Sequence, residues 1–529
     1  MNNPMALSSD TAMINLSLAS HTNVGKTTLL RTLIRRDVGE VADRAHVTEQ
    51  AEGHVLIDTP QGDTLRLWDT PGFGDSARLL KRLRASDNPI GWLTTQVWDR
   101  FTDRPFFSSQ QAIRNVRDES DVVLYLVNAA EDPASAGYVD VEMQILGWIG
   151  KPVLLLLNQM GAPRARAVEA AEELVWRQHV AVHAGVRGVI GLDAFARCWV
   201  QEDKLLGAVD GVLPPAKQSA FQRLRAAWAK QNIAVFDSAM RALAAQLAAV
   251  AADRETVSSP GFKAKAGRWL RSLLTDREMT DPDTERAMNA LAQRLDGVVR
   301  ETTDRLIALH GLSGRASETI LARVAGQFEI AKPADIGTSG VIGGVVTGAL
   351  GGLTADLAAG GLTFGAGALI GGIVGALGAS GAATAYNLVR GAVDGKVSWS
   401  VEFLAQRPAA ALLRYLAVAH YGRGRGEWVE GEYPPHWQQL VEEVSEHHHG
   451  EIVPVLKAAD QGANADEVAR QMQPLITAMA REALVRLYPE AERIFESTLQ
   501  SDAAGTQQSP QSPGVAQGVP TQPCLKLTP

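Results

Sequence analysis

The sequence predicts an α/β domain with a doubly wound sheet, followed by a mostly α-helical part. Short apolar runs alternate with helical stretches over residues 13–191, which is typical of a doubly wound sheet. Over residues 213–328 and 399–499, Ala, Leu, Arg and Glu recur at helical spacing. Between these two stretches lies a glycine-rich apolar block, which predicts a helical hairpin.

Composition and charge limit the class of protein. The net charge of −8 and the pI near 5.8 argue against a surface that holds nucleic acid by bulk electrostatics, so no nucleic-acid partner is expected. Only Cys198 and Cys524 are present, too few for a disulfide framework or a cysteine metal cluster. The first twelve residues lack the basic start and apolar core of a signal peptide, so we expect synthesis in the cytosol.

Changes in composition divide the 529 residues into six expected segments. These are a flexible N-terminus (1–12), an α/β domain (13–210), a helical domain (211–335), a glycine-zipper hairpin (336–389), a C-terminal helical domain (390–500) and a disordered tail (501–529). The tail is rich in Gln, Ser, Pro and Gly, which cannot bury enough apolar surface to order it.

Six strands are expected in the first domain. They cover residues 13–19, 54–59, 64–68, 121–127, 152–157 and 186–190. The second and third are joined by Pro60, Gln61, Gly62 and Asp63, a composition typical of a hairpin turn.

The first strand runs into a loop typical of phosphate binding. The loop and the start of the next helix read Ser20, His21, Thr22, Asn23, Val24, Gly25, Lys26, Thr27, Thr28. This matches GxxxxGK[ST], except that Ser20 replaces the first glycine. In this motif the backbone amides and the helix N-terminus point at the phosphates, Lys26 reaches the β and γ oxygens, and the Thr27 hydroxyl ligates Mg²⁺.

The third strand ends in Asp69-Thr70-Pro71-Gly72, a DxxG sequence that follows Thr27 by 42 residues. Asp69 would hold Mg²⁺ through water, and the Gly72 amide would sense the γ-phosphate. Thr48 lies 21 residues from both Thr27 and Asp69, in a polar stretch suited to a mobile first switch. Its hydroxyl would complete the Mg²⁺ shell; the alternative is an ordinary loop threonine.

Asn158-Gln159-Met160-Gly161 follows a buried strand, where GTPases carry NKxD. Asn158 fits this pattern, but Gly161 replaces the Asp that accepts from guanine, and Gln159 replaces the Lys beneath the base. Guanine selectivity is therefore inferred more from the overall arrangement than from this loop. Asp193 either supplies the missing carboxylate or caps a helix that starts at Ala194.

These motifs resemble those of bacterial GTPases of the Era and TrmE type, within the translation-factor class of P-loop proteins. The matching positions are 20–27, 69–72 and Asn158, all within residues 13–200. The segments 192–202, LDAFARCWVQE, and 414–428, RYLAVAHYGRGRGEW, are similar to those of a bacterial group in which such a GTPase is fused to a C-terminal domain of unknown function. The resemblance implies GTP and GDP as ligands, Mg²⁺ as cofactor and GTP hydrolysis as activity.

The resemblance also implies which residues act in hydrolysis. Asn23 occupies the P-loop position that ligates K⁺ in the Era and TrmE relatives; the alternative is that it only shapes the loop. Lys26, Asn23, Thr48 and Gly72 are thus the candidate catalytic residues. Phe73 stands where Ras-like proteins place the glutamine that orients water, so we expect slow turnover without an activator.

Glycines recur every four residues in the apolar block. They are Gly340, Gly344, Gly348, Gly352, and then Gly367, Gly371, Gly375. Such stripes let helices approach closely, most familiarly within membranes. The uncharged runs 336–355 and 357–389 are each long enough to span a bilayer. We expect either a membrane hairpin with both ends in the cytoplasm or a soluble glycine-zipper hairpin inside the helical domain.

The sequence therefore favours a nucleotide-dependent switch at a membrane lipid surface or on a membrane protein, and leaves open whether it forms a homodimer. The expected location is the cytoplasmic face of the inner membrane, or the cytoplasm. One alternative is a ribosome-assembly GTPase, although no basic RNA-binding module is evident. Another is a non-hydrolysing nucleotide-bound scaffold. The run His447-His448-His449 is interpreted as a solvated helix end rather than a metal site.

Overall fold

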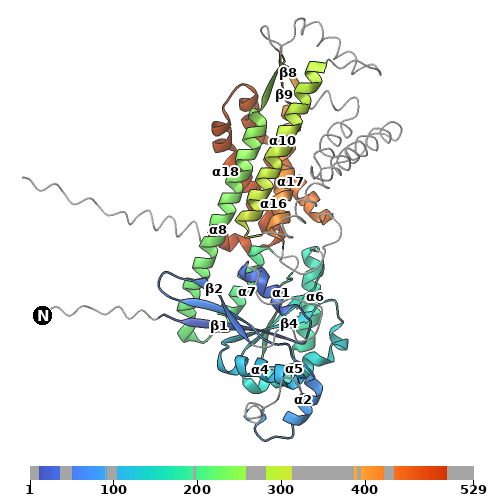
Figure 1. Cartoon of the computed structure of the whole chain (residues 1–529), viewed down its shortest axis with the longest axis vertical. Helices are drawn as coiled ribbons and strands as arrows, with labels where there is room; N and C mark the ends of the chain where they lie inside the picture. Colours follow the sequence, from blue (N-terminus) through green and yellow to red (C-terminus); the bar gives the residue numbers. More distant parts are fainter. Residues whose placement is uncertain are drawn as a thin grey trace, which may run out of the picture.

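The computed structural model describes residues 11–35, 51–89, 91, 104–161, 163–194, 198–257, 282–312, 386–389, 395–421 and 434–496. An α/β domain lies at one end of the molecule, and long helices extend away from it (Figure 1). Some of the expected features lie outside the described residues. They are the first switch with Thr48, residues 336–385 of the glycine-rich block, and the tail 501–529.

The α/β domain is built on a six-stranded sheet with the order β2-β3-β1-β4-β5-β6. Its strands are β1 (Met13–Ser20), β2 (Glu52–Asp58), β3 (Thr64–Asp69), β4 (Val122–Asn128), β5 (Val153–Asn158) and β6 (Val186–Gly191). Neighbouring strands are parallel except β2, which pairs antiparallel with β3 through the expected hairpin turn. The predicted fold class and all six predicted strands are confirmed.

Helices cover both faces of this sheet. They are α1 (Lys26–Ile34), α2 (Ser76–Leu83), α4 (Arg104–Asp118), α5 (Gly137–Ile149), α6 (Arg166–Val180) and α7 (Trp199–Asp210), with a short 3₁₀ turn, η1 (Pro133–Ser135). Successive side chains of a strand point to opposite faces, so β4 buries Leu124 and Leu126 in one core and Val123 and Val127 in another. Figure 1 shows α4 and α5 on one side of the sheet, and α1 and α7 on the side facing the long helices.

The C-terminal part is a body of long helices. They are α8 (Pro215–Ala252), α10 (Pro282–Leu309), α15 (Val401–Ala405), α16 (Arg407–Ala419), α17 (Pro435–Asp460) and α18 (Ala465–Leu487). With 38 residues, α8 is about 57 Å long at 1.5 Å per residue, and it packs against both α18 and α10. One continuous core joins the sheet and the helices, from Leu29 of α1 through Phe236 of α8 to Leu412 and Ile476.

A second, three-stranded sheet was not predicted. Its strands β7 (Arg254–Val257), β9 (Gly395–Trp399) and β8 (Tyr386–Val389) pair antiparallel in that order. The structure thus differs from the expectation of helix at 254–257 and at 386–389, the end of the expected hairpin. Each segment is only four or five residues long. Strand β7 pairs with the distant β9, whereas β8 pairs with β9 a few residues further along the chain. Periodicity does not identify strands this short.

Among the described residues, α8 is the one helix long and apolar enough to cross a membrane by length and composition, with a mean hydropathy of 1.4 in its best window. Of that window, 61% is buried inside the protein. Ala239, Met240 and Leu243 are nearly or fully buried within the shared core. Packing against neighbouring helices therefore accounts for the apolar character of α8, and the membrane hairpin in the glycine-rich block stays a prediction.

Candidate nucleotide-binding site

The phosphate-binding loop connects β1 to α1. Two of its residues take the left-handed conformation, Asn23 at φ 64° and Gly25 at φ 93°. A Cβ atom on Gly25 would lie 2.8 Å from Asn158 Nδ2, so glycine is required there by both backbone conformation and space. Val24 and Thr28 are buried beneath the loop, which fixes the start of α1 with its backbone amides at the carboxyl end of β1.

Lys26 lies under this loop and is 8% exposed. Its ammonium donates a hydrogen bond to Ser20 Oγ at 2.9 Å, so the serine that replaces the first glycine of the motif contacts the lysine directly. Burial lowers the pKa of Lys26, and the Asp69 and Glu142 carboxylates oppose that shift. A phosphate beside the ammonium would favour its charged form.

Thr27, in the first turn of α1, and Asp69, the last residue of β3, are in contact. The Thr27 hydroxyl donates to Asp69 Oδ2 at 2.6 Å, because the parallel pairing of β1 with β3 brings the end of β3 beside the start of α1. A hydroxyl and a carboxylate are oxygen donors of the kind that Mg²⁺ prefers. The two residues therefore fit a magnesium ion bound together with nucleotide phosphates.

The DxxG loop lies directly on the phosphate-binding loop. A Cβ atom on Gly72 would lie 3.1 Å from Lys26 Nζ and 3.0 Å from Thr22 Cα. The next amide, that of Phe73, donates to the Ser20 carbonyl at 2.9 Å. A glycine at position 72 lets the backbone of the DxxG loop approach the Thr22 backbone and the Lys26 ammonium this closely.

Asn158 links the phosphate-binding loop to the loop after β6. Its Nδ2 donates to the Val24 carbonyl at 2.7 Å, and its Oδ1 accepts from the Ala194 amide at 2.8 Å. Asp193, which is 5% exposed, accepts from the Met160 amide through Oδ2. Asp193 does not cap α7, because that helix begins at Trp199 with Cys198 as its N-cap. Its carboxylate instead lies beside the loop that lacks the usual aspartate.

Residues 181–481, more than half of the chain, match the family described as "Domain of unknown function (DUF3482)". The chain belongs to this family. Residues 16–159 of this DUF3482 protein match the family described as "50S ribosome-binding GTPase". The N-terminal domain is accordingly a GTP-binding domain of the P-loop GTPase class, as the resemblance to Era implies.

Individual proteins are similar to parts of this chain. A curated relative, GTPase Era of Heliobacterium modesticaldum (strain ATCC 51547 / Ice1), is 28% identical over 145 residues, which are 27% of this chain and 39% of the relative. The DUF3482 protein thus spans well under half of that relative's length. Crystal structures of Aquifex aeolicus Era bound to GDP·AlF₄⁻ and of mGMPPNP-bound NFeoB from S. thermophilus are also similar.

The structural similarity is limited in extent. For the Aquifex Era structure, identity is 17%, coverage is 38% of this chain and 57% of that chain, and the TM-score is 0.28. For the NFeoB structure, the values are 13%, 55%, 87% and 0.22. The fold assignment in the DUF3482 protein therefore rests on its own strand order and loop geometry together with the family matches.

The sequence did not predict a buried carboxylate beneath the phosphate-binding loop. Glu142 of α5 is fully buried, and its Oε1 lies 2.7 Å from His21 Nδ1. The Ser76 hydroxyl donates to the same oxygen at 2.5 Å, and the Tyr125 hydroxyl donates to Oε2 at 2.6 Å. We call these four residues the Glu142 network. It ties the phosphate-binding loop, the helix after the DxxG loop and β4 of the DUF3482 protein together.

Burial and, next, the Glu142 carboxylate raise the pKa of the Tyr125 phenol well above its ordinary value, so Tyr125 stays a hydrogen-bond donor. His21 also stacks on Tyr138, with ring centroids 4.7 Å apart. A signal for Glu142 was present in the sequence: it interrupts the apolar stripe of Val139, Met143 and Leu146 at helical spacing. A charged residue on a buried stripe needs partners, because an unpaired buried charge is costly.

Proposed function

We propose that this protein is a switch that binds GTP with Mg²⁺, hydrolyses it slowly, and couples the nucleotide state to a membrane or a membrane-associated partner. One observation carries the proposal: Lys26, the Thr27 and Asp69 oxygen pair and the Gly72 backbone converge at the carboxyl ends of β1 and β3. That convergence supplies a cation, metal ligands and a phosphate sensor within one loop cluster. We place the protein in the cytoplasm or at the cytoplasmic face of the inner membrane.

Each residue of the loop cluster has its own role in binding the nucleotide. The loop amides and the Lys26 ammonium bind and orient the β- and γ-phosphates. Thr27 and Asp69 would hold Mg²⁺, which when bound neutralises phosphate charge. The Gly72 amide would contact the γ-phosphate and so report its presence to the helix that follows.

Slow hydrolysis is supported by the residue after Gly72. Phe73 is fully buried, so this position offers no polar group to orient the attacking water. Asn23, the candidate K⁺ ligand, lies in the phosphate-binding loop with a left-handed backbone. An added cation or a partner would then supply the missing stabilisation of the transition state.

Coupling to the helical body is supported by two contacts in the N-terminal half of α8. Arg35, directly after α1, donates to Asn232 Oδ1 of α8 at 2.5 Å. Arg223 of α8 donates two hydrogen bonds, of 2.7 and 2.8 Å, to the carboxylate of Asp63 in the β2–β3 turn. These hydrogen bonds lower the pKa of Asp63. The helix that starts at the phosphate site and the hairpin that leads to the DxxG loop therefore both contact α8.

Single-turnover hydrolysis by the purified full chain tests the proposal. We expect slow conversion of GTP that requires Mg²⁺, is faster in K⁺ than in Na⁺, and rises on addition of liposomes. ATP should be a poorer substrate. Absence of Mg²⁺-dependent binding and turnover of GTP in folded protein would contradict the enzymatic proposal, and equal rates with and without liposomes would contradict its membrane part.

A ribosome-assembly role is the second candidate. The description of the family that matches residues 16–159 names binding to the 50S ribosome. The net charge of −8 argues against it. Co-sedimentation with ribosomal subunits in GTP, but not in GDP, would favour this candidate over the membrane switch.

Asp193 is proposed as the carboxylate that selects guanine. Asp193→Asn should narrow the preference for GTP over ATP, because an amide replaces one acceptor with a donor facing the guanine ring nitrogens. A lost charged hydrogen bond is worth roughly 1.5–3 kcal/mol, so we expect GTP affinity to fall about tenfold or more while ATP affinity is little changed. Competition of both nucleotides against a fluorescent analogue measures this. Parallel losses for GTP and ATP would instead indicate a purely structural role.

A further inference from the structure

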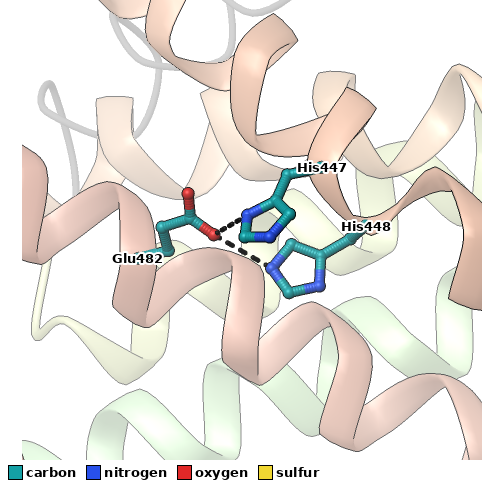
Figure 2. Close-up of side chains that lie close together, drawn as sticks. All are labelled: His447, His448 and Glu482. Atoms are coloured by element: carbon teal, nitrogen blue, oxygen red, sulfur yellow. Dashed lines mark hydrogen bonds and ion pairs between the residues drawn. The ribbon is translucent and has the colours of Figure 1, made fainter.

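Three polar side chains from two helices converge at one point of the helical body (Figure 2). His447 and His448 lie on α17, and Glu482 lies on the neighbouring α18. His447 Nδ1 and His448 Nε2 are each 3.0 Å from the same oxygen, Glu482 Oε2. One potential ligand atom from each residue lies within 4.8 Å of the other two.

This placement corrects the interpretation of the histidine run. The run lies in the middle of α17, which spans Pro435–Asp460, and is not a helix end. The carboxylate that completes the group comes from a helix 34 residues further along the chain. Sequence spacing alone therefore did not show it.

We propose that His447, His448 and Glu482 bind a divalent transition-metal ion of the zinc type. Two imidazole nitrogens and one carboxylate oxygen form a known ligand set for Zn²⁺, with water completing the tetrahedral shell. Imidazole donors disfavour Mg²⁺ and Ca²⁺, which prefer oxygen. On binding, each neutral imidazole presents the lone pair of its metal-facing nitrogen to the ion and keeps its single N–H proton on the other ring nitrogen.

Neighbouring residues orient these ligands. Arg486 contacts the other oxygen of the carboxylate, Glu482 Oε1, at 2.6 Å, which leaves Oε2 facing the histidines. His448 Nδ1 lies 3.6 Å from the Glu451 carboxylate. Metal-bound histidines commonly place their second nitrogen near a carboxylate in this way. Arg486 also contacts Glu443 Oε2 at 3.1 Å, so its charge is shared between two carboxylates.

A metal at this position would clamp α17 to α18. The His448 side chain is 13% exposed and that of Glu482 is 20% exposed, whereas that of His447 is 66% exposed. The ion would thus enter from solvent on the His447 side. Because α18 packs against α8, the clamp would stiffen the surface formed by the longest helices of the body.

Titration calorimetry of the untagged full chain with ZnCl₂, after EDTA treatment and dialysis without nucleotide, tests this. We expect one zinc ion per chain at this site and a higher melting temperature with zinc. His447→Ala and Glu482→Gln should weaken that binding about tenfold or more and abolish the zinc-dependent rise in melting temperature. The exposed neighbour His449 is the matched control, and His449→Ala should leave both unchanged.

Two results would overturn the inference. One is zinc binding that His449→Ala weakens as much as His447→Ala, which would indicate an unstructured histidine run. The other is binding that Glu482→Gln leaves unchanged. Since His447 is largely exposed, its replacement should not disturb the fold, and the melting temperature without zinc verifies this. Asp69→Ala in the nucleotide site should not alter zinc binding at this clamp, which keeps the result independent of the proposed function.

Discussion

Lys26→Ala is expected to weaken GTP binding by about 10- to 100-fold without destabilising the fold. A charge-assisted hydrogen bond contributes roughly 1.5–3 kcal/mol, and each 1.4 kcal/mol corresponds to a factor of ten. The fold should not suffer, because burial of the Lys26 ammonium lowers its pKa and so opposes its charged form. Calorimetric titration with GTP in Mg²⁺, together with thermal unfolding, measures both effects.

Lys151→Ala is the matched control. Lys151 donates to the Ser120 carbonyl at 2.6 Å. Both residues lie at the amino ends of β4 and β5, whereas the phosphate-binding loop follows the carboxyl end of β1. Removal of the Lys151 side chain should leave GTP affinity unchanged. If Lys26→Ala bound GTP as the parent does, the assignment of this loop as a phosphate site would be wrong.

Glu142→Ala is expected to destabilise the protein by about 2–4 kcal/mol, because it leaves the buried hydroxyl groups of Ser76 and Tyr125 without their acceptor. It should also slow GTP hydrolysis, because Ser76 begins the helix directly after the DxxG loop. Urea unfolding followed by tryptophan fluorescence and single-turnover hydrolysis measure the two effects.

Glu142→Gln separates the contributions of charge and hydrogen bonding. It keeps the side-chain volume and one acceptor oxygen, so it should recover part of the stability. Glu131→Ala removes an exposed carboxylate that accepts from Tyr138 at 3.0 Å, and serves as the control with little expected effect. Glu142→Ala behaving like Glu131→Ala would show that the Glu142 network does not support the switch region.

The α/β domain could be predicted from sequence because its signals are local. Strands β4 and β5 are continuous apolar runs, and β3 alternates partly exposed and buried positions. The loop from Ser20 to Thr27 carries its chemistry in consecutive residues. Asp69 and Gly72 were found by their fixed motif. Thr27 and Asp69 lie in hydrogen-bond contact, as their proposed joint role requires.

The features that were missed depend on contacts between distant segments. Strand β7 is four residues long and pairs with β9 far along the chain, Arg254 with Ser398, and β8 joins the sheet as the short neighbour of β9. The partners of the other two missed residues lie on other elements. Glu142 contacts His21 and Ser76, and Glu482 contacts the two histidines of α17. Periodicity within one helix cannot identify such partners.

The continuous core between the sheet and α8 has a thermodynamic consequence. A ligand that binds only the folded state raises the free energy of unfolding of every element that unfolds together with its binding site. Leu29 of α1 and Ile476 of α18 belong to one buried cluster, so nucleotide held at one end of the molecule would lower the population of frayed or open states at the far end of the helices. Long-range communication would then need no hinge. Bound GTP would raise the free energy of unfolding of the whole cooperative unit, and hydrolysis of GTP would lower it again.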